Sequence, residues 1–401
     1  MLGEEEGRGA ANMVGLWRQD FGYKENQNVL VLSGGDNWTG PAISTWFQGE
    51  SMVEVMNVMG YDASVIGNHE FDFGLEVLQQ RLGEAKFPYL SANIRYKDIG
   101  DFDFISYASA LREVVPEVVA AGADLILVPG HLCMPEIAEV KAVAGELGIV
   151  LVGGGHCNEL VAGESEGTVT LVGGAHMAAY AWATFTIDTE TGQVIDVVYG
   201  AEQNQGGTAD PAVAEVVARW QAESDETLND AIGYLQNDLP RRSQGIEELI
   251  TESWLKAYTQ ANIALTNRGG IRDGIPAGDL TLAAVIGVLP FDNVIIETHL
   301  TGSQLEQALA GHLDATVAGG MHREDFHWVM DETGERLEGD TVYSVLVNNF
   351  MYAGGDGYNL FAHYDPNAYN TGIDWRQPVI DWILDQDSSP EQPLDNAIEG
   401  L

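Results

Sequence analysis

Basic residues are scarce in this sequence. It contains 18 lysines and arginines against 61 aspartates and glutamates, and its formal net charge is -43. No basic stripe is available to neutralise the phosphates of a long polyanion, which excludes duplex DNA as a partner. A small nucleotide at a metal centre is still compatible with this charge, because bound divalent cations reverse the local field.

The acidic excess does not indicate disorder. Hydrophobic residues make up 45% of the chain and aromatic residues 9%, which is too much for an acidic disordered protein. The composition resembles that of proteins from salt-loving organisms, in which bulk salt screens the repulsion between like charges. The sequence also lacks an apolar run long enough to span a bilayer and a charged-then-apolar signal peptide after Met1. We therefore expect a halophilic chain that is soluble as written, with no membrane span.

Cysteine occurs at two positions, Cys133 and Cys157, which excludes a disulfide framework. Each cysteine lies within two residues of a histidine, His131 or His156, so a thiolate metal ligand or an active-site disulfide is conceivable. Small, half-buried cysteines beside the site are the more common situation. We expect that situation here.

The length of 401 residues exceeds what one hydrophobic core usually organises, which predicts two domains. In the first half, apolar runs rich in β-branched residues alternate with helical stretches, the pattern of a layered α/β domain. The expected strands are 29–32, 63–66, 124–128 and 149–152. The expected helices are 49–59, 75–85 and 108–121.

Beyond residue 187 the sequence becomes polar and glycine-containing, and a helix at 211–224 leads into new material. We therefore expect four parts along the chain. They are a first α/β domain at 1–202, a linker with a helix at 203–225, a second α/β domain at 226–386 and a flexible acidic tail at 387–401.

Each of the four expected strands of the first domain is followed by a polar side chain. In chain order these side chains are Asp36, Asn68, His131 and His156. A single histidine at a strand end is usually structural, but four such residues at the catalytic edge of one sheet favour a metal site. Mixed oxygen and imidazole ligands suit a borderline dication such as Zn, Mn, Co or Fe.

These motifs, Gly-Asp-Asn at 35–37, Gly-Asn-His-Glu-Phe-Asp at 67–72, Gly-His at 130–131 and Gly-Gly-His at 154–156, resemble the ordered signature of calcineurin-like metallophosphoesterases of the 5′-nucleotidase branch. The resemblance implies a sandwich-type phosphoesterase domain with two divalent metal ions. It assigns Asp36 as the bridging ligand and Asn68, His131 and His156 as the remaining ligands of the second ion. It also implies that His69 is the catalytic histidine and that Asp72 orients it.

The sequence departs from the family pattern in three places. No Asp-x-His motif precedes Asp36, and the segment 9–17 resembles the helix that follows that motif in relatives. Asn158 stands where many relatives have a histidine or glutamine that binds the first ion. The stretch 94–104 is shorter than the family spacing. We therefore expect an N-terminally truncated, incomplete phosphoesterase domain whose first metal site lacks ligands and whose activity is impaired.

The second half contains glycine loops beside arginine and phenylalanine, in an order that resembles the C-terminal 5′-nucleotidase domain. Glycine allows close approach of backbone to a ligand, and arginine offers a planar fork for anions. By this resemblance Phe291 and Phe350 stack on the base. The resemblance assigns the remaining contacts, to base, ribose and phosphate, to Asn267, Arg272, Asn293 and Asp356.

The sequence thus predicts hydrolysis of nucleotide phosphate esters by a two-metal mechanism, with the substrate bound between the two domains. One alternative is a related phosphoesterase that acts on cyclic nucleotides or nucleotide sugars. Another is a degenerate nucleotide-binding protein that lacks the first metal site. The resemblance further implies a secreted, periplasmic or cell-surface location.

Overall fold

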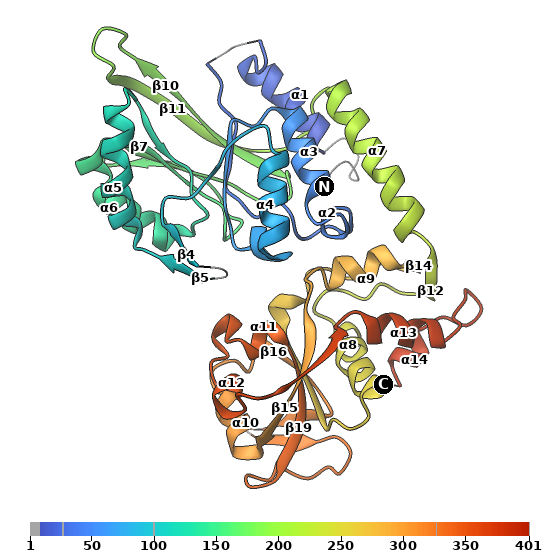
Figure 1. Ribbon diagram of the computed structural model, residues 1–401. Helices are drawn as coiled ribbons and strands as arrows, with labels where there is room; N and C mark the ends of the chain where they lie inside the picture. Colours follow the sequence, from blue (N-terminus) through green and yellow to red (C-terminus); the bar gives the residue numbers. More distant parts are fainter. Residues whose placement is uncertain (1–8, 26–27, 99–100, 326, 401) are drawn as a thin grey trace. The chain divides into compact units, whose positions relative to one another are not determined.

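The computed structural model describes residues 9–25, 28–98, 101–325 and 327–400 (Figure 1). The first eight residues of the expected first domain lie outside this part of the chain. Two compact units are present, one formed by 1–39 with 47–222 and the other by 40–46 with 223–401. The short insert 40–46 contains α2 (Ala42–Trp46), which packs on α9 (Leu282–Val288) of the second unit.

The first unit is an α/β structure, as its alternating pattern predicts. Two groups of parallel strands are connected by helices that lie along them (Figure 1). The helices of this unit are α1 (Ala10–Phe21), α3 (Glu50–Met59), α4 (Gly74–Glu84), α5 (Tyr107–Ala120), α6 (Met134–Leu147) and α7 (Pro211–Leu228). The bounds of α3, α4, α5 and α7 agree with the four expected helices to within a few residues, because the apolar periodicity that marks them is local.

The expectation that four strands form one sheet is wrong. Two of them belong to a three-stranded parallel sheet of β1 (Leu32–Ser33), β2 (Ala63–Val65) and β3 (Tyr89–Leu90). The other two belong to a four-stranded sheet in the order β6 (Ile126–Val128), β7 (Ile149–Gly154), β9 (Thr168–Gly173) and β8 (Leu160–Ser165). Hydrogen-bond pairing between distant segments decides this split, and a local apolar pattern carries no information about it.

Two antiparallel hairpins complete the strands of the first unit. They are β4 (Ile94–Asp98) with β5 (Asp101–Phe104), and β10 (Ala179–Ile187) with β11 (Val194–Gln203). One apolar core of the unit lies between the four-stranded sheet and the helices α5 and α6. Val140, Val143 and Ala144 of α6 pack there against Val152 and Val172 of the sheet.

The second unit is built on a five-stranded sheet with helices on both faces (Figure 1). The strand order is β16 (Thr316–Gly319), β13 (Ile263–Asn267), β19 (Val342–Asn348), β15 (Val294–Thr301) and β20 (Tyr369–Asp374). Because successive side chains of a strand point to opposite faces, Val345 and Val347 join one core while Leu346 joins the other.

One core of the second unit contains α8 (Gln244–Ala257), α9, α13 (Gln377–Asp385) and α14 (Asp395–Ile398). The other contains α10 (Gly302–Leu309), α11 (Asn349–Tyr352) and α12 (Phe361–Tyr364). The remaining strands form the pairs β12 (Ala231–Leu235) with β14 (Gly278–Thr281) and β17 (Met321–Glu324) with β18 (His327–Met330).

The segment 387–400 packs on the second unit, contrary to the expected flexible acidic tail. Leu394 and Ile398 are buried in the core of α8 and α13. The carboxylate of Asp395 accepts hydrogen bonds from the backbone N–H groups of Gln236 and Asn237. Two well-placed apolar side chains suffice to dock a short helix, and the polar composition around them conceals this. Within the described residues, no helix is long and apolar enough to cross a membrane.

Candidate functional site

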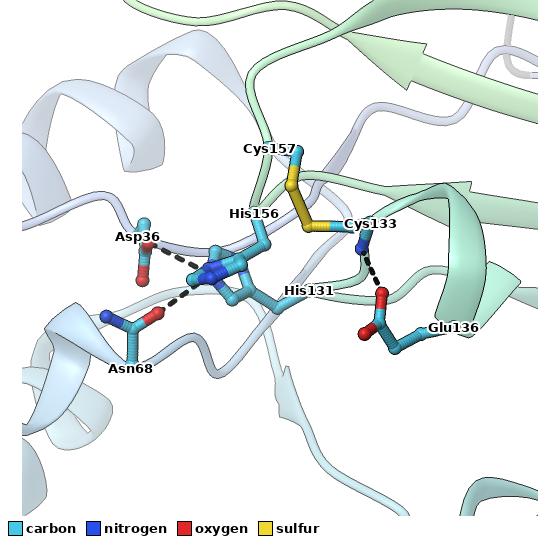
Figure 2. Close-up of a disulfide and its surroundings, with 7 residues drawn as sticks. All are labelled: Asp36, Asn68, His131, Cys133, Glu136, His156 and Cys157. Atoms are coloured by element: carbon cyan, nitrogen blue, oxygen red, sulfur yellow. Dashed lines mark hydrogen bonds and ion pairs between the residues drawn. A yellow bond between two sulfur atoms is a disulfide. The ribbon is translucent and has the colours of Figure 1, made fainter. Parts of the chain in front are cut away.

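The loops at the carboxyl ends of the parallel strands of two sheets in the first unit bring Asp36, Asn68 and His156 together around one atom, Nε2 of His131 (Figure 2). Asp36 Oδ2 lies 2.9 Å from this nitrogen, Asn68 Oδ1 lies 3.1 Å from it and His156 Nδ1 lies 2.8 Å from it. The other ring nitrogen, Nδ1, is 2.7 Å from the carbonyl of Gly34 and donates to it. The ring of His131 is thereby fixed at the junction of the two sheets.

These four atoms have the character of metal ligands. The oxygens of Asp36 and Asn68 are acceptors only, and Nδ1 of His131 already carries the proton that it donates to Gly34. The lone pairs of these oxygen and nitrogen atoms therefore point toward one another, and few protons are present to form hydrogen bonds between them. Asp36, His131 and His156 each offer one ligand atom, and these three atoms all lie within 4.8 Å of one another. Oxygen and imidazole donors at this spacing fit a borderline divalent cation.

Glu70 holds the first two motifs in register, a role that we did not assign from the sequence. Its side chain is fully buried, and its carboxylate accepts backbone N–H groups from Asp36 at 2.9 Å, Asn37 at 2.7 Å and Gly67 at 2.7 Å. The only signal in the sequence was a glutamate inside the motif 67–72. A buried carboxylate that ties two ligand loops together explains why the motif contains it.

Backbone geometry at the site is demanding. Asp36 adopts a left-handed conformation with φ of 56°, which is uncommon for a residue with a Cβ atom. A Cβ atom on Gly67 would lie 2.2 Å from Asp36 Oδ1, so only glycine fits there. In the same way a Cβ atom on Gly155 would lie 2.4 Å from the carbonyl oxygen of Gly34. The glycines of the motifs therefore allow the loops to pack backbone against backbone.

His69 and Asp72 form a hydrogen-bonded pair beside this cluster. Nδ1 of His69 lies 2.8 Å from Oδ2 of Asp72, and Nε2 lies 4.0 Å from Oδ2 of Asp36. The backbone N–H of His69 donates to Oδ1 of Asp36 at 2.9 Å. His69 begins a short 3-10 helix, His69–Phe71, and Asp72 caps its end, which places an oriented imidazole next to the clustered ligands.

The charges of the cluster influence one another. Burial by itself would raise the pKa of Asp36, but the hydrogen bond from His131 and the positive charges of His131 and His69 hold this pKa below its ordinary value. Burial would lower the pKa of His131, and the hydrogen bond to Asp36 together with its negative charge raises it instead. Burial raises the pKa of Glu70, and the three backbone donors oppose this shift. The site thus stabilises adjoining opposite charges.

Asn158 is an exposed residue of the turn that follows β7. It has a left-handed backbone with φ of 57°, and its N–H donates to the carbonyl of Gly155 at 3.1 Å. The structure thus places Asn158 two residues beyond His156. Its role as a ligand is still a prediction.

The expectation of two separate half-buried cysteines is wrong. Cys133 and Cys157 form a disulfide that joins the loop of His131 to the turn of His156 (Figure 2). The position of each cysteine near a histidine left a disulfide open as an alternative, but the sequence spacing of 24 residues did not favour it. Two adjacent strand ends of one sheet bring the two loops together, and only the fold determines that adjacency.

In the second unit, the end of β13 contacts the glycine loop near 355. Asn267 Nδ2 donates to Asp356 Oδ2 at 2.8 Å, and Asn348 Nδ2 donates to Asn267 Oδ1 at 2.9 Å. Asp356 has a left-handed backbone with φ of 53°. Asn348 is fully buried at the end of β19, so it orients Asn267 toward the loop.

Phe291 and Arg272 lie together on the same unit. The guanidinium carbon of Arg272 lies 5.8 Å from the ring centroid of Phe291, a cation–π arrangement. Trp375 anchors the Phe291 loop, because its indole N–H donates to the Phe291 carbonyl at 2.8 Å. Arg241 is a neighbour that we did not assign from the sequence: burial lowers its pKa, and the charges of Arg272 and Arg242 lower it further. Three arginines thus gather in a strongly acidic chain.

Phe350 lies in the short helix α11, which directly precedes the glycine loop of Asp356. A Cβ atom on Gly355 would lie 2.5 Å from its ring, so the ring packs against bare backbone. The side chain is 43% exposed. Asn293, by contrast, is buried, and its carbonyl accepts the N–H of Trp375 at 3.1 Å.

The strand register brings the segments that carry Phe291 and Phe350 to the same end of the five-stranded sheet, where β15 begins and β19 ends. β15 and β19 are antiparallel with Ile295 opposite Asn348, so the start of one strand lies beside the end of the other. The side chain of Asn349 accepts the N–H of Val294 at 3.2 Å across this edge. β13 runs parallel to β19 and ends at the same edge. The substrate residues expected from the sequence are thus delivered to one end of the sheet.

The fold and these two sets of residues define a two-unit α/β protein with a candidate metal centre on its first unit. Residues 217–363 match the family model described as 5′-nucleotidase, C-terminal domain. The chain is 26% identical to the 5′-nucleotidase of Vibrio vulnificus, over 87% of this chain and 81% of that protein. It is also 26% identical to the trifunctional nucleotide phosphoesterase protein YfkN of Bacillus subtilis, over 84% of this chain but only 30% of that longer protein.

A solved structure shows the same fold along almost the whole chain. The 5′-nucleotidase precursor from Thermus thermophilus superposes with a TM-score of 0.77 at 21% identity, and the match covers 95% of this chain and 91% of that chain. Residues 217–363 thus match the 5′-nucleotidase C-terminal domain, and the chain as a whole resembles curated 5′-nucleotidases and shares the fold of a solved 5′-nucleotidase precursor.

Proposed function

We propose that this protein is a metal-dependent phosphoric monoester hydrolase that removes phosphate from nucleotides by a two-metal mechanism. The observation that carries the proposal is the convergence of Asp36, Asn68 and His156 on Nε2 of His131, next to the His69 and Asp72 pair. The names of the relatives, which include 5′-nucleotidases, support the same activity.

The four clustered residues would hold one cation, and Asp36 with Asn158 would contribute to a second. Divalent cations supply charge neutralisation on the phosphate and a bound water of lowered pKa. His69 is oriented through Nδ1 by Asp72, and Nε2 is the nitrogen proposed to meet the phosphate. In its protonated form it donates a hydrogen bond to the leaving oxygen as negative charge develops there. No covalent intermediate is required.

The second unit is proposed to hold the nucleoside. Phe291 and Phe350 supply aromatic faces for stacking on a base. Asn267, Asn293 and Asp356 offer polar contacts to base or ribose, and Arg272 offers charge-assisted contacts to an anion. Two observations support this assignment. The segments that carry Phe291 and Phe350 lie at the same end of the five-stranded sheet, and residues 217–363 match the 5′-nucleotidase C-terminal domain.

The test is phosphate release from AMP by the purified chain with Mn²⁺ or Co²⁺. Substitution Asp36→Ala removes an acceptor from the centre of the cluster. We expect kcat/KM to fall by about 1,000-fold or more, because a ligand of the ions that activate the water is lost. The exposed carboxylate of Asp196 on β11 gives a matched control, and Asp196→Ala should leave kcat/KM unchanged.

Parallel reactions with 2′,3′-cyclic AMP and a nucleotide sugar separate the related substrate classes. If either compound reacts faster than AMP, it is the preferred substrate and the proposal of a nucleotide monoester is wrong. Bound metal without phosphate release from any of these compounds would instead identify a nucleotide-binding protein.

We also propose that the protein works in an oxidising compartment, such as the cell surface or periplasm. Disulfides persist there and are rare where thiol reductants are abundant. The Cys133 to Cys157 disulfide supports this location.

Adaptation to high salt is proposed from the net charge of -43. Repulsion between like charges destabilises the compact state, and salt screens it. The melting temperature should rise as KCl increases from dilute buffer to molar concentration, and by more than in sucrose of equal osmolality. A melting temperature that does not change with KCl would contradict this adaptation.

A further inference from the structure

The disulfide joins the two loops that carry the histidines of the candidate metal centre (Figure 2). Cys133 is two residues beyond His131, and Cys157 directly follows His156. The covalent path from one histidine to the other therefore contains one intervening residue, Leu132, and the disulfide. The disulfide itself takes no part in the proposed hydrolysis.

The two ends of this bridge are held very differently. Cys133 is the N-cap of α6, and its N–H donates to the carboxylate of Glu136 at 3.1 Å in a capping box. Cys157 belongs instead to an exposed turn that also contains His156 and Asn158. The backbone ties of this turn include one hydrogen bond from Gly155 to the Leu132 carbonyl. The disulfide thus fastens an exposed turn to the end of a packed helix.

The turn needs such a constraint because of what His156 faces. Its Nδ1 lies 2.8 Å from Nε2 of His131, which is also within hydrogen-bond distance of two acceptor oxygens. Lone pairs that converge in this way repel one another until a cation or proton is shared between them. An unconstrained exposed turn could relieve the repulsion by moving His156 outward.

We propose that the Cys133 to Cys157 disulfide is a positioning element that holds His156 in place for metal binding. This inference rests on the proposed function, because it presupposes a cation at the cluster. Both sulfurs are engaged in the S–S bond, so neither is a thiolate ligand in the oxidised protein. Reduction by a dithiol supplies two electrons and two protons, opens the bond to two thiols and frees the turn.

Loss of a group that orients a metal ligand typically weakens metal affinity by about 10- to 100-fold. We expect a loss of this size for Co²⁺ when the disulfide is reduced or replaced by the double substitution Cys133→Ala with Cys157→Ala. Reoxidation of the reduced wild-type protein should restore affinity. Activity is expected to follow metal occupancy.

The experiment measures Co²⁺ binding by calorimetry and the visible absorption of bound Co²⁺, which reports the ligand geometry. Oxidised, dithiol-reduced and reoxidised wild-type proteins are compared with the double variant, with the bridge verified by mass spectrometry of the alkylated chain. Val143→Ala is the matched control. It removes buried volume from the same helix α6 and lowers stability without touching the site.

A weaker Kd with an altered Co²⁺ spectrum in the reduced protein and the double variant, but not in Val143→Ala, supports the positioning role. Unchanged affinity and spectrum in both would overturn it. New sulfur-to-cobalt absorption on reduction would also overturn it, because the cysteines would then act as ligands. Absence of Co²⁺ binding in the oxidised wild-type protein would instead count against the proposed metal centre and leave no site to position.

Discussion

The two units hold their functional residues by different means. In the first unit, the parallel strands that carry the site are two to six residues long. The site depends on polar and covalent ties between loops: the buried Glu70 carboxylate, the Asp36 to His131 pair and the disulfide. In the second unit, the corresponding residues extend from a five-stranded sheet with an apolar core on each face.

This difference suggests that the two units meet different physical requirements of their sites. A metal centre needs converging polar atoms, which an apolar core cannot supply, so the first unit is stabilised locally by hydrogen bonds and charge. A nucleoside needs flat apolar faces with a few polar contacts, which a rigid sheet edge supplies. Polar substitutions should therefore disturb the first unit more, and removal of rings should disturb the second.

The largest effect is expected at Glu70. In Glu70→Gln, one carboxylate oxygen becomes an NH₂ group that faces N–H donors, so buried donors lose their acceptor. We expect a loss of about 2–4 kcal/mol in the free energy of unfolding and weaker Co²⁺ binding, measured by urea denaturation and calorimetry.

Glu136→Gln is the control for this change. Glu136 is partly exposed and accepts one backbone N–H, from Cys133, which the amide oxygen of glutamine can still accept. Its effect should be below about 0.5 kcal/mol. Equal effects of the two substitutions would show that Glu70 is not a special tie between the ligand loops.

The second effect tests the aromatic residues of the second unit. Replacement of Phe291 and Phe350 by alanine should raise KM for AMP, since each stacked ring contributes about 1–3 kcal/mol. KM for ribose 5-phosphate, which has no base, should change little. Tyr369→Ala is a suitable control, because this ring is 60% exposed on the edge strand β20. Equal changes in KM for both substrates would show that the two phenylalanines are structural.

The smallest effect is expected at Asp210, a polar tie of the first unit. Its carboxylate contacts Arg18 at 2.7 Å and Lys24 at 3.3 Å and caps α7 through Val213. Burial by itself would raise the pKa of Asp210, but the N–H of Val213 and the charges of Lys24 and Arg18 lower it. A lowered pKa means that the stabilisation is complete above the unfolded value of about 3.9.

This stabilisation should disappear as pH falls through the lower pKa of the folded state. Asp210→Asn keeps the helix cap but loses the charge. We expect a cost of about 1 kcal/mol or less at neutral pH, with the difference from wild type shrinking below pH 4. Urea denaturation at a series of pH values measures it. A difference that stays constant down to the lowest pH would exclude the carboxylate charge as its cause.

Much of the secondary structure could be predicted, because the residue pattern within a single segment determines it. The helices α3, α4, α5 and α7 follow apolar periodicities that the chain carries within a single segment. Asp36 and His131 could be proposed as partners because each follows a strand of the parallel α/β pattern, although the two strands belong to different sheets. The structure places these two side chains 2.9 Å apart at their closest atoms.

Other features could not be predicted, because they depend on contacts between distant segments. The sequence by itself determined which residue types follow each strand, where the helices lie and how acidic the surface is. Only the tertiary structure decided that the strands divide between two sheets, that Cys133 pairs with Cys157 and that Ile398 docks its short helix on a core. It also gave Glu70 its role, since three N–H donors from two loops meet at one carboxylate only after both loops have folded. The physical reason is common to all of these features: pairing and burial are properties of two surfaces, and a local sequence pattern specifies only one of them.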